Sequence, residues 1–461
     1  DHNVSVSGAV PHMPYRVSVA YTNENGILKT SNMQRLTGAI NLNPNFFDKK
    51  LNIQLNVKGV YNKNRFADRA AIGLATQYDP TQPVYMEGNP YGNGYFMYMK
   101  QEGDKTSPID IGLANPVAML EEKDDKSTVY RSIGNAQIDY KFHFLPELRA
   151  NLNLGYDVSK SKGDVIIADN SPLTYCTGNF KNGFGENSHY TQLKRNTLLD
   201  FYLNYANTFG VNYIDVMAGY SWQHFYNSTT NSYPYSAAYA EKTGEEFYKK
   251  GDDYASESYL VSFFGRLNYT LLNRYLVTFT LRNDGSSRFS PDNRWGLFPS
   301  ISLGWNISEE KFWKPIKPVI SNFKVRGSYG LVGNDQIGSD RFAYLAIVNL
   351  TESPSYTTGY GGSTTSLSGP TYNRFQNNEL TWEVGNKLNV GVDLQLFNSL
   401  NITVDGFREI RDNIFQQKNS IPNYLGTAST KIYGNFAKVK NTGFDLALDY
   451  GKQLNRNFSI Q

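Results

Sequence analysis

The sequence of 461 residues contains a single cysteine, Cys176, so it cannot form an internal disulfide framework. It has no uninterrupted apolar run of the roughly 20 residues that a membrane-spanning helix requires, and its mean hydropathy is −0.50. Its 45 basic and 42 acidic residues nearly cancel and form no block of one sign, so the charge gives no reason to expect a nucleic-acid partner. A disulfide-rich domain, a helical membrane protein and a nucleic-acid-binding protein are therefore disfavoured.

The sequence also lacks the motifs of common enzyme and cofactor sites. It contains no P-loop, no Gly-x-Ser-x-Gly elbow and no His-Glu-x-x-His. The five histidines are scattered, and none stands beside a second ligand at metal-binding spacing. Residues 92–94, Gly-Asn-Gly, resemble part of a dinucleotide fingerprint, but they do not link a strand to a helix and are read as a flexible loop. We predict that the protein is not an enzyme and has no catalytic residues, cofactor or metal.

The sequence does contain many strand-length segments in which apolar and polar residues alternate. Residues 50–58, 147–157 and 387–396 are the clearest examples. A period of two places apolar residues on one face of a strand and polar residues on the other. Many such strands in one chain favour an all-β fold, a transmembrane antiparallel β-barrel that faces lipid outside and water inside.

The connections between these segments are alternately short and long, as in membrane barrels, which have tight turns on one rim and long loops on the other. The short ones are residues 44–48, 144–147, 272–274 and 397–400, and the long ones are 63–128, 161–188, 227–255 and 332–383. We count about 15 strands and the start of another, which predicts an incomplete barrel with short periplasmic turns and long extracellular loops.

The 34 tyrosines, 27 phenylalanines and five tryptophans favour the ends of these strands and fit the aromatic girdles of a barrel. A large soluble β protein could use the same residues as core. The alternation predicts two sets of residues on opposite faces. Leu152, Leu154, Val390, Val392 and Leu394 should face lipid, and Asn151, Asn153, Asn389, Asp393 and Gln395 should face the interior.

One run, residues 281–289, Leu-Arg-Asn-Asp-Gly-Ser-Ser-Arg-Phe, stands out from the alternating pattern. Asn-Asp-Gly-Ser-Ser is typical of a turn, with Gly285 available for a positive φ angle and hydroxyl side chains that bond the backbone. From these residues alone we predict a structured loop.

Several further motifs, one early in the chain and the others after this run, lie in register with it, and together they closely resemble the SusC-like TonB-dependent transporters of Bacteroidetes outer membranes. They are residues 21–26, 293–300, 324–330, 333–334, 378–383 and 439–444. The resemblance implies a barrel of about 22 strands, an N-terminal plug, energy supplied through TonB, and a SusD-like surface lipoprotein as a lid. The plug, the TonB box and the last strands have no counterpart in the sequence. We therefore expect residues 1–461 to be a partial barrel domain.

The resemblance implies a protein of the bacterial outer membrane, surrounded by lipid, that imports an oligomeric nutrient, either a glycan or an oligopeptide. One alternative is a siderophore or cobalamin receptor of the same class without a lid, and another is a secreted β-sandwich adhesin. Aromatic residues suited to stacking on substrate are Tyr91, Tyr95, Phe96, Tyr98, Tyr233, Tyr235 and Tyr239. Motif residues with a structural or partner-facing role are Arg282, Asp284, Gly285, Arg288, Phe289, Trp295 and Trp382.

Overall fold

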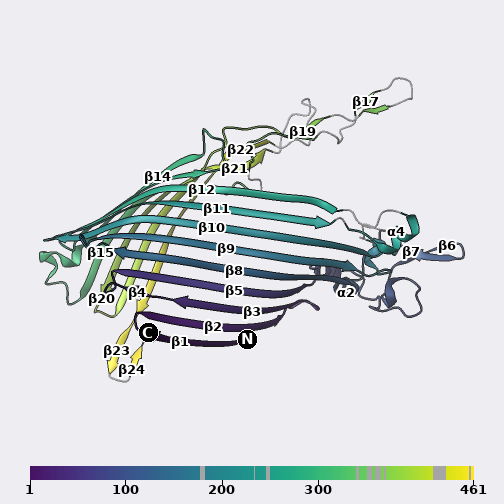
Figure 1. The fold of residues 1–461 in the computed structure, drawn as a ribbon, viewed down its shortest axis with the longest axis horizontal. Coiled ribbons are helices and arrows are strands. Elements are labelled where there is room, and N and C mark those ends of the chain that lie inside the picture. Colours follow the sequence, from purple (N-terminus) through teal and green to yellow (C-terminus); the bar gives the residue numbers. More distant parts are fainter. Residues whose placement is uncertain are drawn as a thin grey trace. The chain divides into compact units, whose positions relative to one another are not determined.

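The computed structural model describes residues 1–176, 182–232, 234–244, 250–338, 342–349, 356–358, 365–367, 370–418, 432–455 and 458–460. Its main element is a 16-stranded sheet in which strands follow one another in sequence order (Figure 1). Each pair of neighbours with a recorded register is antiparallel. The predicted all-β antiparallel fold is therefore confirmed.

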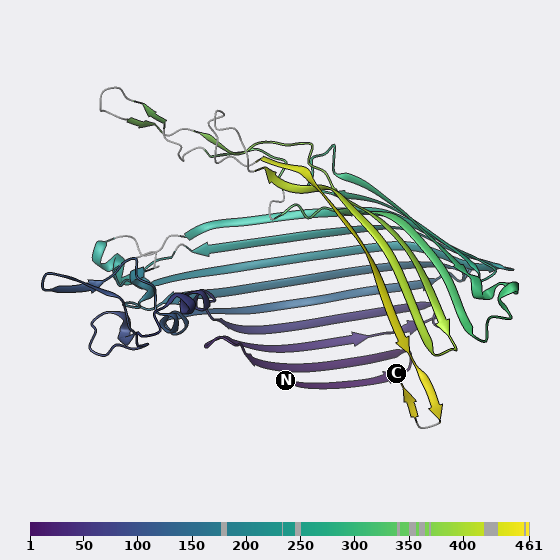
Figure 2. The ribbon, with the colours of Figure 1, turned by 180° about the vertical axis from the view of Figure 1, so that it is seen from behind.

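The strands of the sheet are β1 (His2–Val10), β2 (Met13–Asn25), β3 (Asn32–Leu42), β4 (Asn45–Phe46), β5 (Leu51–Phe66), β8 (Lys123–Lys141), β9 (Leu148–Ile167), β10 (Glu186–Phe209), β11 (Asn212–Ser232), β12 (Lys250–Leu271), β13 (Tyr275–Ser286), β14 (Trp295–Asn306), β15 (Ile320–Asn334), β20 (Glu383–Leu396), β21 (Leu400–Lys418) and β22 (Ile432–Tyr450). Separate two-stranded sheets are formed by β6 (Met99–Glu102) with β7 (Lys105–Pro108), β16 (Ile347–Asn349) with β19 (Thr371–Arg374), β17 (Tyr356–Thr358) with β18 (Thr365–Leu367), and β23 (Lys452–Asn455) with β24 (Phe458–Ile460). The consecutive strands β20, β21 and β22, yellow-green in Figure 2, lie side by side.

Helices are few and short. They are α1 (Ala70–Gln77), α2 (Pro116–Glu121), α3 (Leu173–Cys176) and α4 (Ala237–Thr243), with 3₁₀ turns η1 (Gly92–Gly94), η2 (Ile307–Glu309) and η3 (Lys311–Trp313). None of the helices in the described residues has the length and hydropathy that a membrane-spanning helix needs.

The chain forms two compact units, which are described separately below. Unit 1 comprises residues 1–137, 154–197 and 225–257, and unit 2 comprises residues 138–153, 198–224 and 258–461. The core of unit 1 lies in its connections, where Ala71, Tyr95, Ala118, Met119 and Leu173 are buried together. The core of unit 2 also lies at the ends of strands and contains Phe289, Phe298, Ile337, Ala343, Leu380 and Trp382.

Strand β14 shows how the alternating sequence becomes two faces. Trp295, Leu297, Ile301, Leu303 and Trp305 are all exposed and share one face, because successive side chains of a strand point to opposite sides. Tryptophans therefore bracket the apolar face of this strand. The other face carries Gly296, Phe298, Ser300, Ser302 and Gly304.

The same separation of faces holds in the strands where it was predicted. Val390 in β20 and Leu154 in β9 are exposed, whereas Asn151 in β9 is buried on the opposite face. Asp393 also lies on the polar face of β20, where it accepts hydrogen bonds from Arg326 of β15. The alternation of apolar and polar faces is therefore confirmed at these positions.

Several strands extend further than predicted, so the long connections are shorter. Strand β9 continues to Ile167 rather than residue 160, and β12 begins at Lys250 rather than near residue 259. The predicted long loop 63–128 shrinks to 67–122 and contains α1, α2 and the β6–β7 hairpin. Residues 161–164 and 253–257 in these strand ends are mostly polar, so they lack the alternation that marks a half-buried strand.

The connections lie alternately at the two ends of the strands, because the strands are antiparallel and consecutive. The connections at one end of the strands form what we call the short-turn edge, and they include residues 11–12, 43–50, 142–147, 210–211, 272–274 and 397–399. A longer connection at this edge, 307–319, contains η2 and η3. The connections at the other end of the strands form what we call the long-connection edge, and they include residues 67–122, 168–185 and 335–382.

Candidate functional site

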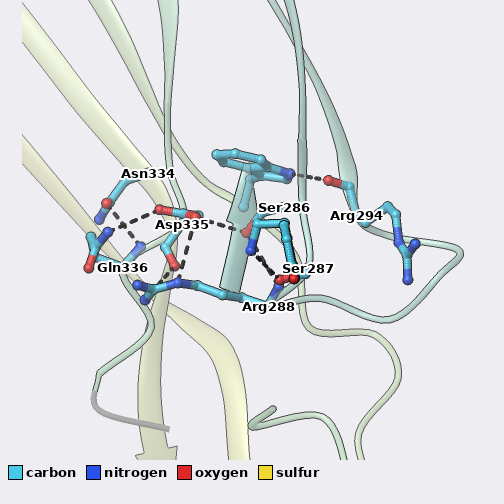
Figure 3. A network of polar contacts seen from close by, with 9 residues as sticks. Ser286, Ser287, Arg288, Arg294, Asn334, Asp335 and Gln336 are labelled. Atoms are coloured by element: carbon cyan, nitrogen blue, oxygen red, sulfur yellow. Dashed lines mark hydrogen bonds and ion pairs between the residues drawn. The ribbon is translucent and has the colours of Figure 1, made fainter. Parts of the chain in front are cut away.

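Motifs that are far apart in the sequence converge at the long-connection edge of unit 2 (Figure 3). The indole Nε1 of Trp382 donates a hydrogen bond to the carbonyl of Arg294 at 3.0 Å, across 88 residues of sequence. The Ser290 hydroxyl and the Asn293 amide both donate to the carbonyl of Asn378 at 2.7 Å. Residues 281–300 and 378–383 therefore form one assembly, which we call the motif cluster.

Aromatic rings fill the interior of the motif cluster. The ring of Trp382 lies 5.4 Å from that of Phe289 and 5.3 Å from that of Phe298, measured between centroids. Phe289 is 0% exposed and Trp382 is 5% exposed. Ring pairs at these tilted and edge-on angles are favourable beyond the area that they bury. Phe289 and Trp382 are therefore structural, and a partner-facing role does not fit their burial.

A buried ion pair lies beside these rings. The Arg288 side chain approaches Asp335, with Nε 3.7 Å from Oδ2, and its Nη1 donates to the Asp335 carbonyl at 3.4 Å. The hydroxyl of Ser286 donates to the same carboxylate at 2.8 Å (Figure 3). Arg288 is 9% exposed, and a buried charge is tolerated only when it is paired and hydrogen-bonded. Arg288 thus fixes the connection after β13 against the end of β15.

Glu383 makes a second buried polar link in the motif cluster. Its Oε2 accepts a hydrogen bond from the Asn334 amide at 2.8 Å, and its Oε1 accepts from the backbone N–H of Phe415 at 3.0 Å. These contacts join the last residue of β15, the first of β20 and the bulged part of β21. The motif cluster therefore holds three strand ends in one arrangement.

Gly285 was expected to supply a positive φ angle in a turn, and that prediction is wrong. It lies inside β13, directly opposite Trp295 of β14, and is not among the residues with positive φ. A Cβ atom at this position would stand 2.8 Å from the Trp295 ring. The glycine is needed because the indole packs against its backbone.

The other predicted motif residues are divided between the two faces of the sheet. Trp295 is exposed on the apolar face. Arg282 and Asp284 form an ion pair of 3.0 Å on the polar face. Both line a recess of about 470 Å³ whose other polar lining residues include Thr278, Thr280, Ser300, Ser302, Ser328 and Lys387. Arg282 and Asp284 therefore face this recess, whereas Trp295 is exposed on the opposite, apolar face of the sheet.

Sequence reasoning missed an ion network of three residues on this polar face. Arg326 of β15 donates to Asp393 of β20 at 3.1 and 3.3 Å and to Asp405 of β21 at 2.7 Å. The neighbouring Gly391 makes room, because a Cβ atom there would lie 2.4 Å from the Asp405 carboxylate. The three charged residues stand at polar positions of three neighbouring strands, and this is the signal that could have indicated the network. The sequence does not give the register between these strands, so it does not show that the three residues meet.

The predicted substrate-binding aromatics of residues 91–98 lie in the long connection of unit 1. Tyr91 packs edge-on against Tyr175 at 5.8 Å, and Phe96 packs edge-on against Tyr98 at 5.3 Å. Tyr95 is 8% exposed and donates from its hydroxyl to Glu121. Tyr95 therefore belongs to the core of the connection, while the other three are half-buried.

The second predicted aromatic group lies after β11. Tyr233 is outside the described residues. Tyr235 pairs through its backbone with Asn187 at 2.8 and 2.9 Å, and the ring of Tyr239 lies 5.3 Å from that of Phe184. Sequence reasoning missed Tyr85, which is 56% exposed and packs against Tyr95 at 5.2 Å. It stands apart from the aromatic cluster in sequence, so only the fold reveals that it joins it.

Glu121 links this aromatic core to an earlier strand connection. It accepts hydrogen bonds from Lys29 and Tyr95, and these bonds hold its pKa below the ordinary value of 4.5. Burial, reinforced by the Glu121 carboxylate, raises the pKa of the Tyr95 hydroxyl. Burial also raises the pKa of the Tyr78 hydroxyl to about 12. Both tyrosines are therefore neutral hydrogen-bonding groups at physiological pH.

We expect the packing of residues 67–122 to weaken as pH falls below 4.5. Because the folded pKa of Glu121 is lowered, its stabilising effect is complete above the ordinary value and is lost as pH drops through the folded value. Limited proteolysis of this connection between pH 7 and pH 3.5 would measure the effect. E121Q should reduce the pH response but not abolish it, because the pKa values of Asp68 and Asp79 in the same connection are also lowered, whereas the adjacent control E122Q should retain the full response. An identical response in E121Q and the unchanged protein would contradict the assignment.

Within the ranges that the structure describes, no group of three or more His, Cys, Asp or Glu side chains is placed to hold a metal ion.

Comparison with known proteins agrees with this architecture. The family model for the β-barrel of TonB-dependent receptor-like proteins matches residues 74–460. The TonB-dependent receptor SusC of Bacteroides thetaiotaomicron is 38% identical, with 100% of this chain and 45% of that protein covered. The TonB-dependent receptor P3 of Formosa agariphila is 27% identical over 99% of this chain and 44% of its own. The chain thus spans less than half the length of these relatives.

Solved structures show the same fold. A chain of the RagAB peptide transporter aligns with a TM-score of 0.75 at 19% identity, covering 99% of this chain and 49% of its own. The siderophore receptor PirA from Acinetobacter baumannii aligns with a TM-score of 0.58 at 12% identity, covering 98% and 57%. The family match, together with one long sheet in sequence order, excludes the β-sandwich adhesin. The chain is an outer-membrane protein and belongs to the TonB-dependent receptor-like β-barrel family.

Proposed function

We propose that the full protein is an active outer-membrane transporter that imports an oligomeric nutrient, a glycan or an oligopeptide. Energy would come from TonB, through a part of the protein beyond residues 1–461, and a SusD-like surface lipoprotein would cover the long-connection edge. The observation that carries this proposal is the 38% identity to SusC along the whole chain. The fold shared with the RagAB peptide transporter supports it.

The polar face of unit 2 suits the inside of such a transporter. Arg282 and Asp284 line a recess with serine and threonine hydroxyls, and Arg326 bridges two carboxylates nearby in the sheet. Sugars and peptides carry many hydroxyl and amide groups, so a wall of donors and acceptors can exchange hydrogen bonds with them. This wall would form the path of the substrate.

Aromatic residues of the long connections would make the first contact with substrate. Tyr91, Phe96, Tyr98, Tyr235 and Tyr239 present half-buried rings, which can stack on sugar faces or apolar peptide side chains. Tyr85 is more exposed than any of them. We assign Tyr95 a supporting role, because its ring is buried beneath Tyr85 and its hydroxyl bonds Glu121.

The lid would rest on the connection between β5 and β8. This connection has its own core and exposes the apolar side chains of Ile72, Val84, Met86 and Ile111. A rigid apolar surface favours a stable interface, which would bury more than about 1,000 Å².

We expect the full protein, purified from native outer membranes, to carry a lipoprotein that mass spectrometry identifies. A triple variant with Val84, Tyr85 and Met86 changed to aspartate should lose the lipoprotein and still insert in the membrane, because the change lies in a connection and not in a strand. The control K314D, exposed at the short-turn edge, should retain it. If the unchanged protein purifies without a lipoprotein and imports at normal affinity, the siderophore-type alternative takes the place of the lid model.

A further inference from the structure

The sheet of unit 1 contains a recess with an excess of positive charge. It has a volume of about 460 Å³ and is lined by residues of β3, β5, β8, β9 and β10. The charged lining residues are Arg35, Lys58, Arg131, Asp157 and Lys194, so four cations share the recess with one carboxylate. We call it the basic recess.

The alternation of side chains along the strands places the basic recess on the polar face. Val57 of β5 is exposed on the apolar face, and the next residue, Lys58, points to the opposite side. Tyr130 of β8 is exposed on the apolar face in the same way, and Arg131 points away from it. The basic recess therefore lies on the face that the proposed function assigns to the inside of the transporter.

Most of this positive charge has no counterion in the part of the chain that the structure describes. The carboxylate of Asp157 accepts hydrogen bonds from Arg131 at 2.8 and 2.6 Å, which occupies the one acidic group of the lining. Arg35 donates to a neutral side-chain amide of β5 at 3.3 Å. Lys58 and Lys194 are exposed, and no ion pair joins either to another described residue. Three of the four cations are thus not neutralised by a carboxylate in these ranges.

The polar face of unit 2 differs, because cations there are paired. Arg282 pairs with Asp284 at 3.0 Å, and Lys387 lies 3.7 Å from Glu409. Arg326 bridges two carboxylates. An uncompensated charge in a concave wall attracts ions of the opposite sign and raises their local concentration. The excess charge of the basic recess is therefore a local feature that favours anions.

The cations are too far apart to bind one small anion together. Arg35 lies on β3 and Lys194 on β10, with β5, β8 and β9 between them in the sheet. Neighbouring strands are about 4.8 Å apart, so these two residues are about 19 Å apart along the sheet. An ion pair requires a separation of about 4 Å or less. Only a ligand with several negative groups can pair with all the free cations.

We propose that the basic recess selects an acidic oligomer, one that carries several carboxylate groups, as the nutrient. This inference rests on the proposed function and adds the charge of the substrate to it. Arginine and lysine donate charge-assisted hydrogen bonds to carboxylates. Ser159 and Asn196 in the same lining can bond the hydroxyl or amide groups between the charges. A uronic-acid glycan and an acidic peptide both present this chemistry.

The test measures binding to the full protein, purified with any lipoprotein that it carries. Oligogalacturonate is compared with its methyl ester, and a short glutamate peptide with the corresponding glutamine peptide, so the two pairs distinguish the sources of the carboxylates. The acidic member of one pair should bind at least about tenfold more tightly at an ionic strength of about 0.1 M, which three ion pairs can supply. At about 1 M the preference should disappear, because the screening length falls from about 10 Å to about 3 Å.

The variant R35Q/K58Q/K194Q should lose this preference and bind the neutral probes as before. The control K49Q/K105Q/K160Q removes the same charge from three exposed lysines outside the basic recess and should keep the preference. A heat-dependent shift in gel mobility shows whether each variant is folded. The single variant K58Q should reduce the preference in part, and it carries the test if the triple variant does not fold.

Equal binding of the acidic and neutral probes, or a preference that survives in R35Q/K58Q/K194Q, would overturn the proposal. Lower stability of this variant in denaturant with no change in preference would also overturn it, and would indicate an acidic segment beyond residues 1–461 as the occupant. Import in cells tests the proposed function separately. TonB-dependent import of a neutral oligomer would support transport without the acidic substrate, whereas binding of acidic probes without import would support the basic recess and contradict transport.

Discussion

Changing Trp382 to alanine should lower the free energy of unfolding of the barrel by about 3–5 kcal/mol, the usual cost of removing a large buried aromatic side chain. The ring contacts Phe289 and Phe298, and the indole N–H bonds the carbonyl of Arg294. The change would leave a cavity where three motifs meet and an unpaired carbonyl beside it. Unfolding in denaturant, followed by gel mobility of the folded barrel, measures the loss.

The variant W382F separates packing from hydrogen bonding. It keeps an aromatic ring in the same place and loses the bond to Arg294, which should cost about 1 kcal/mol plus a smaller packing term. Equal stability of W382A and the unchanged protein would show that the motif cluster does not hold the strand ends together.

Placing arginine at Ile301 should cost about 2–4 kcal/mol, because a charged residue at the lipid-facing midplane of a barrel loses its hydration. Ile301 is exposed and lies between Trp295 and Trp305 on the apolar face of β14. Refolding into vesicles of defined lipid, measured against denaturant, would give the change in free energy.

The control S302R is one position along the same strand and points to the polar face, where it meets the recess lined by Thr278, Ser300 and Lys387. It should be tolerated far better than I301R. If both variants lose the same stability, the assignment of the lipid-facing side is wrong.

The sequence predicts the central part of each strand well and the strand ends poorly. Alternation in residues 147–157 and 387–396 identified strands and faces that the structure confirms. The end of β9, residues 161–167, was read as loop, because residues 161–164 are all polar or glycine and the apolar residues 165–167 follow one another without alternation. The backbone hydrogen bonds of such strand ends are made to neighbouring strands, and a local sequence pattern carries no information about those neighbours.

The motif cluster shows a second limit. Residues 281–289 were read as a turn because Asn-Asp-Gly-Ser-Ser is common in turns, yet Asp284, Gly285 and Ser286 lie in β13. Ser286 bonds the distant Asp335, and Phe289 packs against the distant Trp382, so no local pattern in residues 281–289 could indicate these contacts. Tyr95 was likewise expected to stack on substrate, and only the fold places it in a core.

The tryptophans that bracket β14 also fix which bilayer this barrel fits. Trp295 and Trp305 stand ten positions apart, a rise of about 33 Å along the strand. At a tilt of about 40° the apolar band is about 25 Å tall. A thicker hydrocarbon core would have to thin around the barrel, at a cost of fractions of a kcal/mol for each Å of mismatch. Hydrophobic matching alone thus favours the thin bacterial outer membrane over thicker bilayers.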